Sequence, residues 1–154
     1  MDREKGTDRT VRGRWSLGDS RCVIKAVVVS WDNWLAARDA GTLRAAGYSV
    51  EMCGGPRQEP CPVLGNLPCP LVDGADVLVY DAWAAGDSDA ARQLIGEVRE
   101  TYPDLPVVLT SVDPRLDWVT TEGPHRVTPV AADATPADLL AAVEAALADQ
   151  GMAV

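Results

Sequence analysis

Two aspartates and two hydroxyl residues stand directly after apolar segments of this sequence, where side chains that carry chemistry are often found. Asp32 follows a β-branched run, Asp81 ends a second apolar run, and Thr110 and Ser111 follow a third. Two carboxylates with a hydroxyl nearby suit an oxygen-preferring divalent ion such as Mg²⁺ and a transferring phosphoryl group. An equally open alternative is that Asp32 caps a helix while Asp81 solvates a turn.

A second candidate site is formed by three cysteines in a segment rich in proline and glycine, residues 53–71. Cys53, Cys61 and Cys69 are separated by seven residues each, so their thiolates could bind Zn²⁺ or an iron–sulfur cluster, or act in thiol redox chemistry. Metal sites usually contain a closer Cys-x-x-Cys pair, and the only histidine, His125, is expected at the opposite edge of the fold. The alternative is that these cysteines are free thiols packed among prolines.

The elements that would position these side chains alternate between apolar runs and amphipathic stretches. The pattern predicts strands over residues 22–30, 48–52, 75–81, 105–110 and 125–130, and helices over 33–46, 88–102 and 135–150, with a further short helix over 113–123. Such alternation is typical of a parallel sheet covered by helices on both faces. We therefore expect an α/β fold of the flavodoxin-like, doubly wound type, with a five-stranded parallel sheet in the order 2-1-3-4-5.

Because the carboxyl ends of parallel strands meet at one edge of a sheet, the residues after each strand should form a common rim. The residues expected there are Trp31 and Asp32, Asp81 and Trp83, Thr110 and Ser111, and Thr128 and Pro129. Trp31, Trp83 and Thr128 could line a pocket at this rim for a small ligand or a peptide.

Several segments resemble those of a known family. They are Val77–Asp81 for a central strand, Leu105–Ser111 for the fourth strand, Arg126–Val130 for the fifth strand, and Thr135–Leu147 for the last helix. The chain from about residue 22 to 148 resembles the CheY-like receiver domain of two-component response regulators. This resemblance implies Asp81 as the phosphoacceptor, Asp32 as one acid of a Mg²⁺ site, and Ser111 (or Thr110) as the switch hydroxyl. It also implies a phosphorelay role, with a histidine kinase or another signalling protein as partner.

The sequence departs from the family pattern at three places. Trp31 occupies one of the two positions where receivers usually carry acids, and Thr128 replaces the lysine that would pair with the acceptor carboxylate. The segment 53–71 replaces the second helix. We therefore expect a degenerate pseudo-receiver that acts through protein–protein contact, with atypical or absent phosphorylation of Asp81. The alternative is a metal-binding or thiol-redox module that uses the three loop cysteines, with Zn²⁺ or an iron–sulfur cluster.

The length of 154 residues corresponds to about one domain. We expect a disordered N-terminal extension over residues 1–21 and a receiver-like domain over 22–150. Residues 1–21 carry six basic and four acidic side chains, a net charge of +2. Because the whole chain has a net charge of −9, the remaining 133 residues have a net charge of −11. An acidic folded domain repels phosphate backbones, and we expect no binding of nucleic acid by the folded domain.

Composition also limits location and activity. No apolar run approaches the roughly 20 residues of a membrane helix, and the N-terminus has no apolar core of a signal peptide. We therefore expect a cytoplasmic protein, with no membrane contact and with reduced cysteines, and the scarcity of lysine against arginine indicates a bacterial source. With one histidine and no nucleophile beside a base, we expect no enzyme. The sequence does not indicate an oligomeric state.

Overall fold

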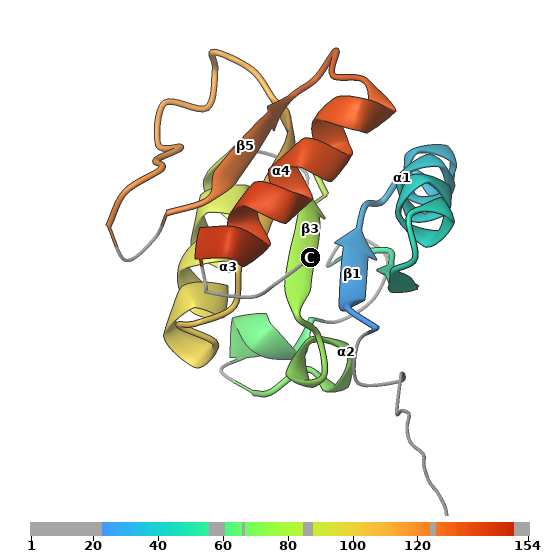
Figure 1. Ribbon diagram of the computed structural model, residues 1–154. Coiled ribbons are helices and arrows are strands. Elements are labelled where there is room, and N and C mark those ends of the chain that lie inside the picture. Colours follow the sequence, from blue (N-terminus) through green and yellow to red (C-terminus); the bar gives the residue numbers. More distant parts are fainter. Residues whose placement is uncertain (1–22, 56–60, 66, 85–87, 124–125, 150–154) are drawn as a thin grey trace, which may run out of the picture.

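The computed structural model describes residues 23–55, 61–65, 67–84, 88–123 and 126–149 (Figure 1). The predictions for residues 1–21, Cys22 and His125 lie outside these ranges. In chain order the elements are β1 (Lys25–Val29), α1 (Asn33–Ala45), β2 (Ser49–Cys53), η2 (Pro62–Gly65), α2 (Pro70–Asp73), β3 (Val77–Asp81), α3 (Ser88–Thr101), β4 (Val107–Val112), β5 (Thr128–Ala131) and α4 (Pro136–Asp149).

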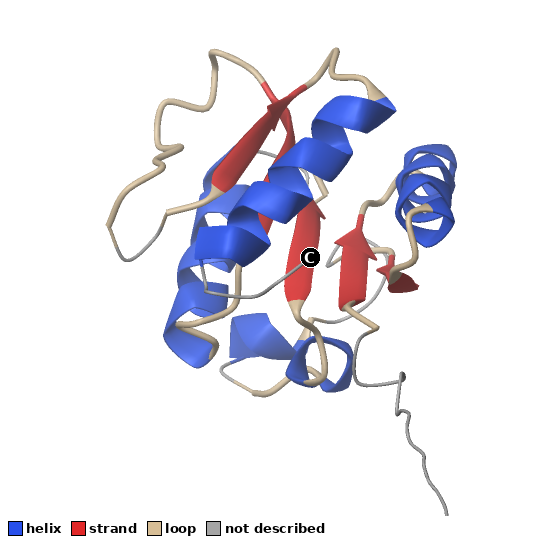
Figure 2. Cartoon of the chain, viewed as in Figure 1, coloured by secondary structure: helices blue, strands red, loops and turns tan. Residues whose placement is uncertain are grey.

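The five strands form one sheet in the order β2-β1-β3-β4-β5, and each neighbouring pair is parallel. Helices cover both faces of this sheet: α1 and α4 pack on one face, and α3 packs on the other with η2 and α2 (Figures 1 and 2). The predicted flavodoxin-like fold and its strand order are confirmed.

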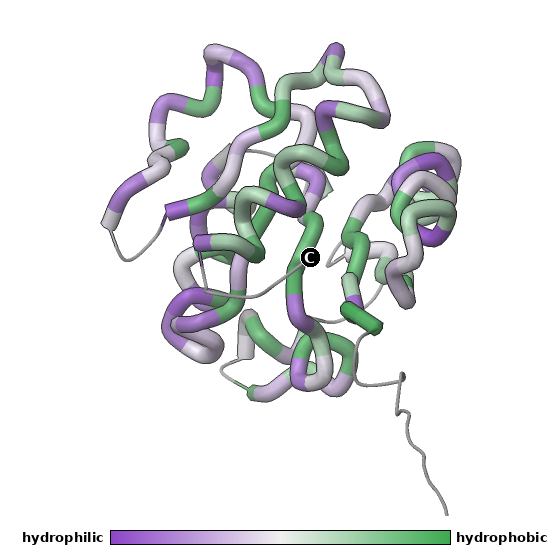
Figure 3. Tube along the Cα trace, viewed as in Figure 1, coloured by the Kyte–Doolittle hydropathy of each residue, from purple (hydrophilic) through white to green (hydrophobic). Residues whose placement is uncertain are grey.

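Strand β3 is the centre of the core, because every one of its five residues is buried. Val77 and Val79 contact the apolar cluster under α1 and α4, while Leu78 and Tyr80 contact the cluster under α3. The hydropathy-coloured trace shows β3 as a largely hydrophobic segment in the middle of the molecule (Figure 3). Burying an aliphatic side chain of this size contributes about 1.5–3 kcal/mol, so β3 is a main source of stability.

Helix α1 begins where the sequence predicts. Trp34 and Arg38 are exposed on this helix, with Trp34 68% exposed. The buried positions follow helical spacing and are Ala36, Asp39, Ala40 and Leu43. Gly47, at φ 101°, follows the helix in the left-handed conformation that favours glycine.

Helix α4 begins with the reciprocal capping contacts that its sequence predicts. The backbone N–H of Asp138 donates to Thr135 Oγ1 at 3.2 Å, and the backbone N–H of Thr135 donates to Asp138 Oδ2 at 2.9 Å. Each contact satisfies a backbone donor that the first turn of a helix leaves without a partner.

Two segments differ from expectation. Residues 113–123 contain turns rather than the predicted short helix, because Asp113 Oδ1 accepts from the backbone N–H of Arg115 at 2.8 Å and holds a local turn. The described part of segment 53–71 is irregular except for η2 and the first residues of α2, each element being a single short turn. Prolines at 62 and 70 begin these turns, and proline inside a longer helix would break it.

Within the described residues, no helix is both long enough and apolar enough to span a membrane.

Candidate functional site

Asp81 lies at the carboxyl end of β3, with its side chain withdrawn from solvent. The residue is 5% exposed, and both of its carboxylate oxygens accept hydrogen bonds from this chain. Oδ2 accepts from the hydroxyl of Ser30 at 3.1 Å, and Oδ1 accepts from the backbone N–H of Trp83 at 2.9 Å. The carboxylate is therefore satisfied inside the fold.

Ser30 is a site residue that the sequence analysis missed. It follows β1 and is level with Asp81, because Val29 pairs with Tyr80 in the register of β1 and β3. Its backbone N–H donates to the carbonyl of Cys53 at 3.0 Å, which ties it to β2. Its position directly after the first strand, one residue before Trp31, was the available signal.

Asp32 acts as the N-cap of α1. Its Oδ1 accepts from the backbone N–H groups of Trp34 at 2.9 Å and Leu35 at 3.2 Å, as the capping alternative predicted. A cap of this kind contributes about 1 kcal/mol. The capping of α1 is therefore sufficient to explain why an aspartate stands at position 32.

The resemblance to receiver domains implies a Mg²⁺ site at this rim, and the side chains present do not fit one. The carboxylate of Asp81 is occupied by internal donors, one oxygen of Asp32 caps a helix, and a neutral serine follows β1 at position 30. Throughout the chain segments that the structure describes, no three or more His, Cys, Asp or Glu side chains are grouped to hold a metal ion.

A second acid, Asp39, lies on the buried face of α1 near Asp81. Burial raises the pKa of Asp39 above its usual value, Arg38 opposes this rise, and the negative charge of Asp81 adds to it. Arg38 pairs with Asp39 at 3.2 Å. An acid at the spacing of the apolar stripe of α1 was the sequence signal for this residue. Further negative charge on Asp81 would therefore face an acidic neighbour.

The two hydroxyl residues at the end of β4 have different surroundings. Thr110 is buried and pairs with Asp81 in the register of β3 and β4. Ser111 has a φ of 62°, an uncommon left-handed conformation for a residue with a side chain. The carbonyl of Ser111 accepts a hydrogen bond from Trp83 Nε1 at 3.0 Å. The backbone at this position therefore holds the Trp83 indole.

Trp83 is also covered from outside. The guanidinium carbon of Arg115 lies 4.6 Å from the centre of a Trp83 ring, and Arg115 pairs with Asp113 at 2.6 Å. The hydrogen bond to Ser111 and the stacked cation together fix the indole against the rim. Trp31 is 44% exposed at the start of α1.

The predicted position of Thr128 is wrong, because β5 begins at this residue rather than ending there. Thr128 pairs with Val108, whereas the residue level with the end of β4 is Ala131. The pocket formed by Thr128 with the two rim tryptophans is therefore not assembled. Alanine at the end of β5 provides no cation for Asp81, and Lys25 lies at the opposite end of β1, paired with Glu51 at 3.0 Å.

The three cysteines of segment 53–71 meet at one place. Cys53, Cys61 and Cys69 are partly buried, and all line a cavity of about 250 Å³ beside β1 and β3. Among the described side chains they are not grouped as metal ligands, so the metal alternative has no support. Tyr80 lines the same cavity, a neighbour that spacing along the sequence could not indicate.

No protein-family model and no curated protein matches this sequence. The fold, in contrast, is shared with solved receiver domains. A response regulator receiver domain protein from Clostridium thermocellum is 15% identical, with a TM-score of 0.65 over 84% of this chain and 98% of that one. A CheY-like receiver domain protein from Methanospirillum hungatei JF-1 has the same identity and TM-score, over 84% and 97%. The chemotaxis protein CheY4 of Vibrio cholerae is 18% identical, with a TM-score of 0.60 over 80% and 98%.

The fold is thus that of CheY-like receiver domains of response regulators. At these identities the likeness concerns the fold, and the roles of individual residues rest on the geometry of this chain. That geometry has an enclosed aspartate at the end of β3 and a serine facing it.

Proposed function

We propose that this chain is a receiver-type signalling module that acts through contact with a protein partner, with phosphorylation of Asp81 atypical or absent. The observation that supports this most directly is the enclosure of Asp81, whose two carboxylate oxygens accept from Ser30 and from the backbone of Trp83. A phosphodonor would have to displace these contacts before it could reach the carboxylate.

Electrostatics supports the same proposal. Phosphoryl transfer depends mostly on positioning and on neutralising the charge of the transferring group. At this rim Ser30 is neutral, Ala131 ends β5, and the nearby acid Asp39 would repel the added charge. The one nearby cation on α1, Arg38, is already paired with Asp39.

The partner would be a histidine kinase or another signalling protein. Trp34 is exposed in the first turn of α1, and Trp31 is exposed just before the N-cap of this helix. The guanidinium carbon of Arg38 lies 5.6 Å from the centre of the Trp34 ring. Tryptophan and arginine are the residue types that most often dominate protein–protein contacts. The net charge of −9 argues against nucleic acid as the partner. We propose a non-enzymatic role in the cytoplasm, where free cysteines remain reduced.

The test is the intact mass of the protein after incubation with Mg²⁺ and acetyl phosphate, with a phosphorylating receiver as a positive control. We expect no phosphoryl adduct on the wild-type protein. The Ser30→Asp variant, which restores an acid beside Asp81, is the informative comparison, and Asp81→Asn is the matched control. An adduct on the wild-type protein that disappears in Asp81→Asn would overturn the proposal that phosphorylation is absent.

A further inference from the structure

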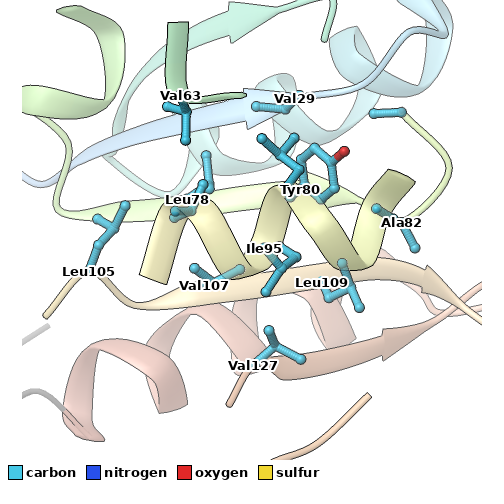
Figure 4. Close-up of a cluster of buried hydrophobic side chains, with 14 of the residues drawn as sticks. Val29, Val63, Leu78, Tyr80, Ala82, Ile95, Leu105, Val107, Leu109 and Val127 are labelled. Carbon is cyan, nitrogen blue, oxygen red and sulfur yellow. The ribbon is translucent and has the colours of Figure 1, made fainter. Parts of the chain in front are cut away.

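A cavity of about 250 Å³ lies between the sheet and the segment that replaces the second helix of a receiver. Val27, Val29 and Leu78 form its floor on β1 and β3, and Leu94 and Val98 of α3 form one side. Figure 4 shows Val29, Val63, Leu78 and Tyr80 on this face of the sheet, with Val63 of η2 directed toward Leu78. The cavity lies on the α3 face of the sheet, and the carboxylate of Asp81 does not line it.

The origin of the cavity is the short length of η2 and α2. Each has four residues, so the two turns cannot present the continuous apolar stripe with which a longer helix would fill the space above β1 and β3. Protein interiors are normally packed with few voids larger than a water molecule. A void of this size within a buried cluster is therefore a feature that needs an occupant.

Tyr80 places an unpartnered polar group in the wall of this cavity. The residue is 1% exposed, and its hydroxyl has no hydrogen-bond partner among the described atoms. Cys61 and Cys53 line the same cavity, and both thiols and the carboxylate of Asp81 act electrostatically on this hydroxyl. Buried hydroxyls are nearly always paired, so an unpaired one that lines a cavity indicates where a ligand atom would bind.

The chemistry of the wall limits the ligand. Among the described lining residues no carboxylate, lysine, arginine or histidine occurs, and burial raises the pKa of Tyr80 far above its usual value, so its hydroxyl stays neutral. Water is a poor occupant because it requires two to four polar partners, whereas this wall offers one hydroxyl and weakly bonding thiols. A cavity of about 150 Å³ holds benzene, so this one holds a bicyclic molecule of about ten heavy atoms.

We propose that this cavity is a binding site for a neutral, largely apolar small molecule with one oxygen that pairs with the hydroxyl of Tyr80. The ligand would contact the hydroxyl of Tyr80 and not the carboxylate of Asp81, because successive side chains of β3 point to opposite faces of the sheet. Tyr80 packs in the cluster under α3, whereas the carboxylate of Asp81 accepts a hydrogen bond from Ser30. The negative charge of Asp81 still acts on the Tyr80 hydroxyl, so the two positions are neighbours.

The experiment compares two probes of nearly equal size, 1-indanone, which has a carbonyl acceptor, and indane, which has none. Calorimetric titration of the full chain should show binding of both, with 1-indanone binding more tightly. In Tyr80→Phe the advantage of 1-indanone should fall by about tenfold, the value of one hydrogen bond, while indane affinity stays unchanged. Tyr48→Phe is the matched control, because the Tyr48 hydroxyl is also buried and unpaired but belongs to the cluster on the opposite face.

A second variant tests the cavity without using Tyr80. Val63→Phe adds volume from η2 into the cavity and should weaken the binding of both probes. The circular dichroism spectrum should stay unchanged, and the thermal midpoint should be at least as high as in the wild type. Absence of binding by either probe at millimolar concentration to the wild-type chain would overturn the proposal. Equal loss of 1-indanone affinity in Tyr48→Phe and Tyr80→Phe, or undiminished binding in Val63→Phe, would overturn it as well.

Discussion

The two faces of the sheet are covered by helices of different length. Helices α1 and α4 have 13 and 14 residues and close their face with a continuous apolar cluster. On the other face α3 is of similar length, but its neighbours η2 and α2 have four residues each and leave a cavity. In this chain β3 is fully buried although one face of the sheet is covered in part by two elements of only four residues.

The polar groups of the adjacent residues Tyr80 and Asp81 also differ, in whether they have hydrogen-bond partners. Asp81 has a donor for each carboxylate oxygen, whereas the hydroxyl of Tyr80 has no partner among the atoms described. The hydrogen-bonding groups of Asp81 at the rim are thus paired, whereas the hydroxyl of Tyr80 at the cavity has no partner among the described atoms. Our proposals therefore assign a structural role to Asp81 and ligand binding to the cavity at Tyr80.

The largest expected effect is a loss of stability when a large side chain is truncated on the densely packed face of the sheet. Leu43→Ala, at a fully buried position of α1, should lower the free energy of unfolding by about 3 kcal/mol, because a new void forms in dense packing. Leu94→Ala, whose side chain already borders the cavity, should cost about 1 kcal/mol less. Urea denaturation followed by circular dichroism measures both, and equal losses would contradict the difference in packing.

A smaller loss is expected at the rim. Ser30→Ala removes the hydroxyl that donates to Asp81 Oδ2 and leaves a buried carboxylate oxygen without that donor, at a cost of about 1–3 kcal/mol at neutral pH. Ser49→Ala, on an exposed position of β2, is the control and should change stability by less than about 0.5 kcal/mol. If both variants unfold at the same urea concentration, the contact between Ser30 and Asp81 contributes no stability.

The smallest effect concerns Asp39 and depends on pH. Because burial raises the pKa of Asp39 in the folded state, that state binds the proton more tightly than the unfolded chain, and stability falls as pH rises above the usual value of 3.8. Asp39→Asn removes this penalty, so the variant should be more stable than the wild type at neutral pH. The gain should shrink as the pH approaches 3.8 from above, and a gain that is constant with pH would contradict the role of burial.

The fold was predictable because it follows from patterns along the chain. The apolar run of β3 and the helical pattern over residues 135–150 are local features, and both identified their elements correctly. The α1 cap at Asp32 was one of two readings that local sequence supports. The helix predicted over 113–123 failed because the Asp113 side chain stabilises a turn that the apolar spacing does not reveal.

The site was less predictable because it depends on register and on contacts across the sheet. Thr128 was assigned to the wrong end of β5, since a shift of three residues in the strand start moves it away from the rim. The pairing of Ser30 with Asp81 joins residues 51 positions apart, and the cavity at Tyr80 exists only after α3 and η2 meet the sheet. Spacing along the chain contains none of this information.

The central claim is that the Asp81 rim is closed and the Tyr80 cavity is open, and one measurement tests both parts together. Amide chemical shifts of the isotope-labelled protein are recorded alone, with Mg²⁺ and beryllofluoride as a phosphoryl mimic, and with 1-indanone. The account predicts no change at Ser30 and Asp81 with the mimic, and saturable changes at Val27, Leu78 and Leu94 with 1-indanone. Saturable changes at the rim with the mimic, and none at the cavity with 1-indanone, would contradict it.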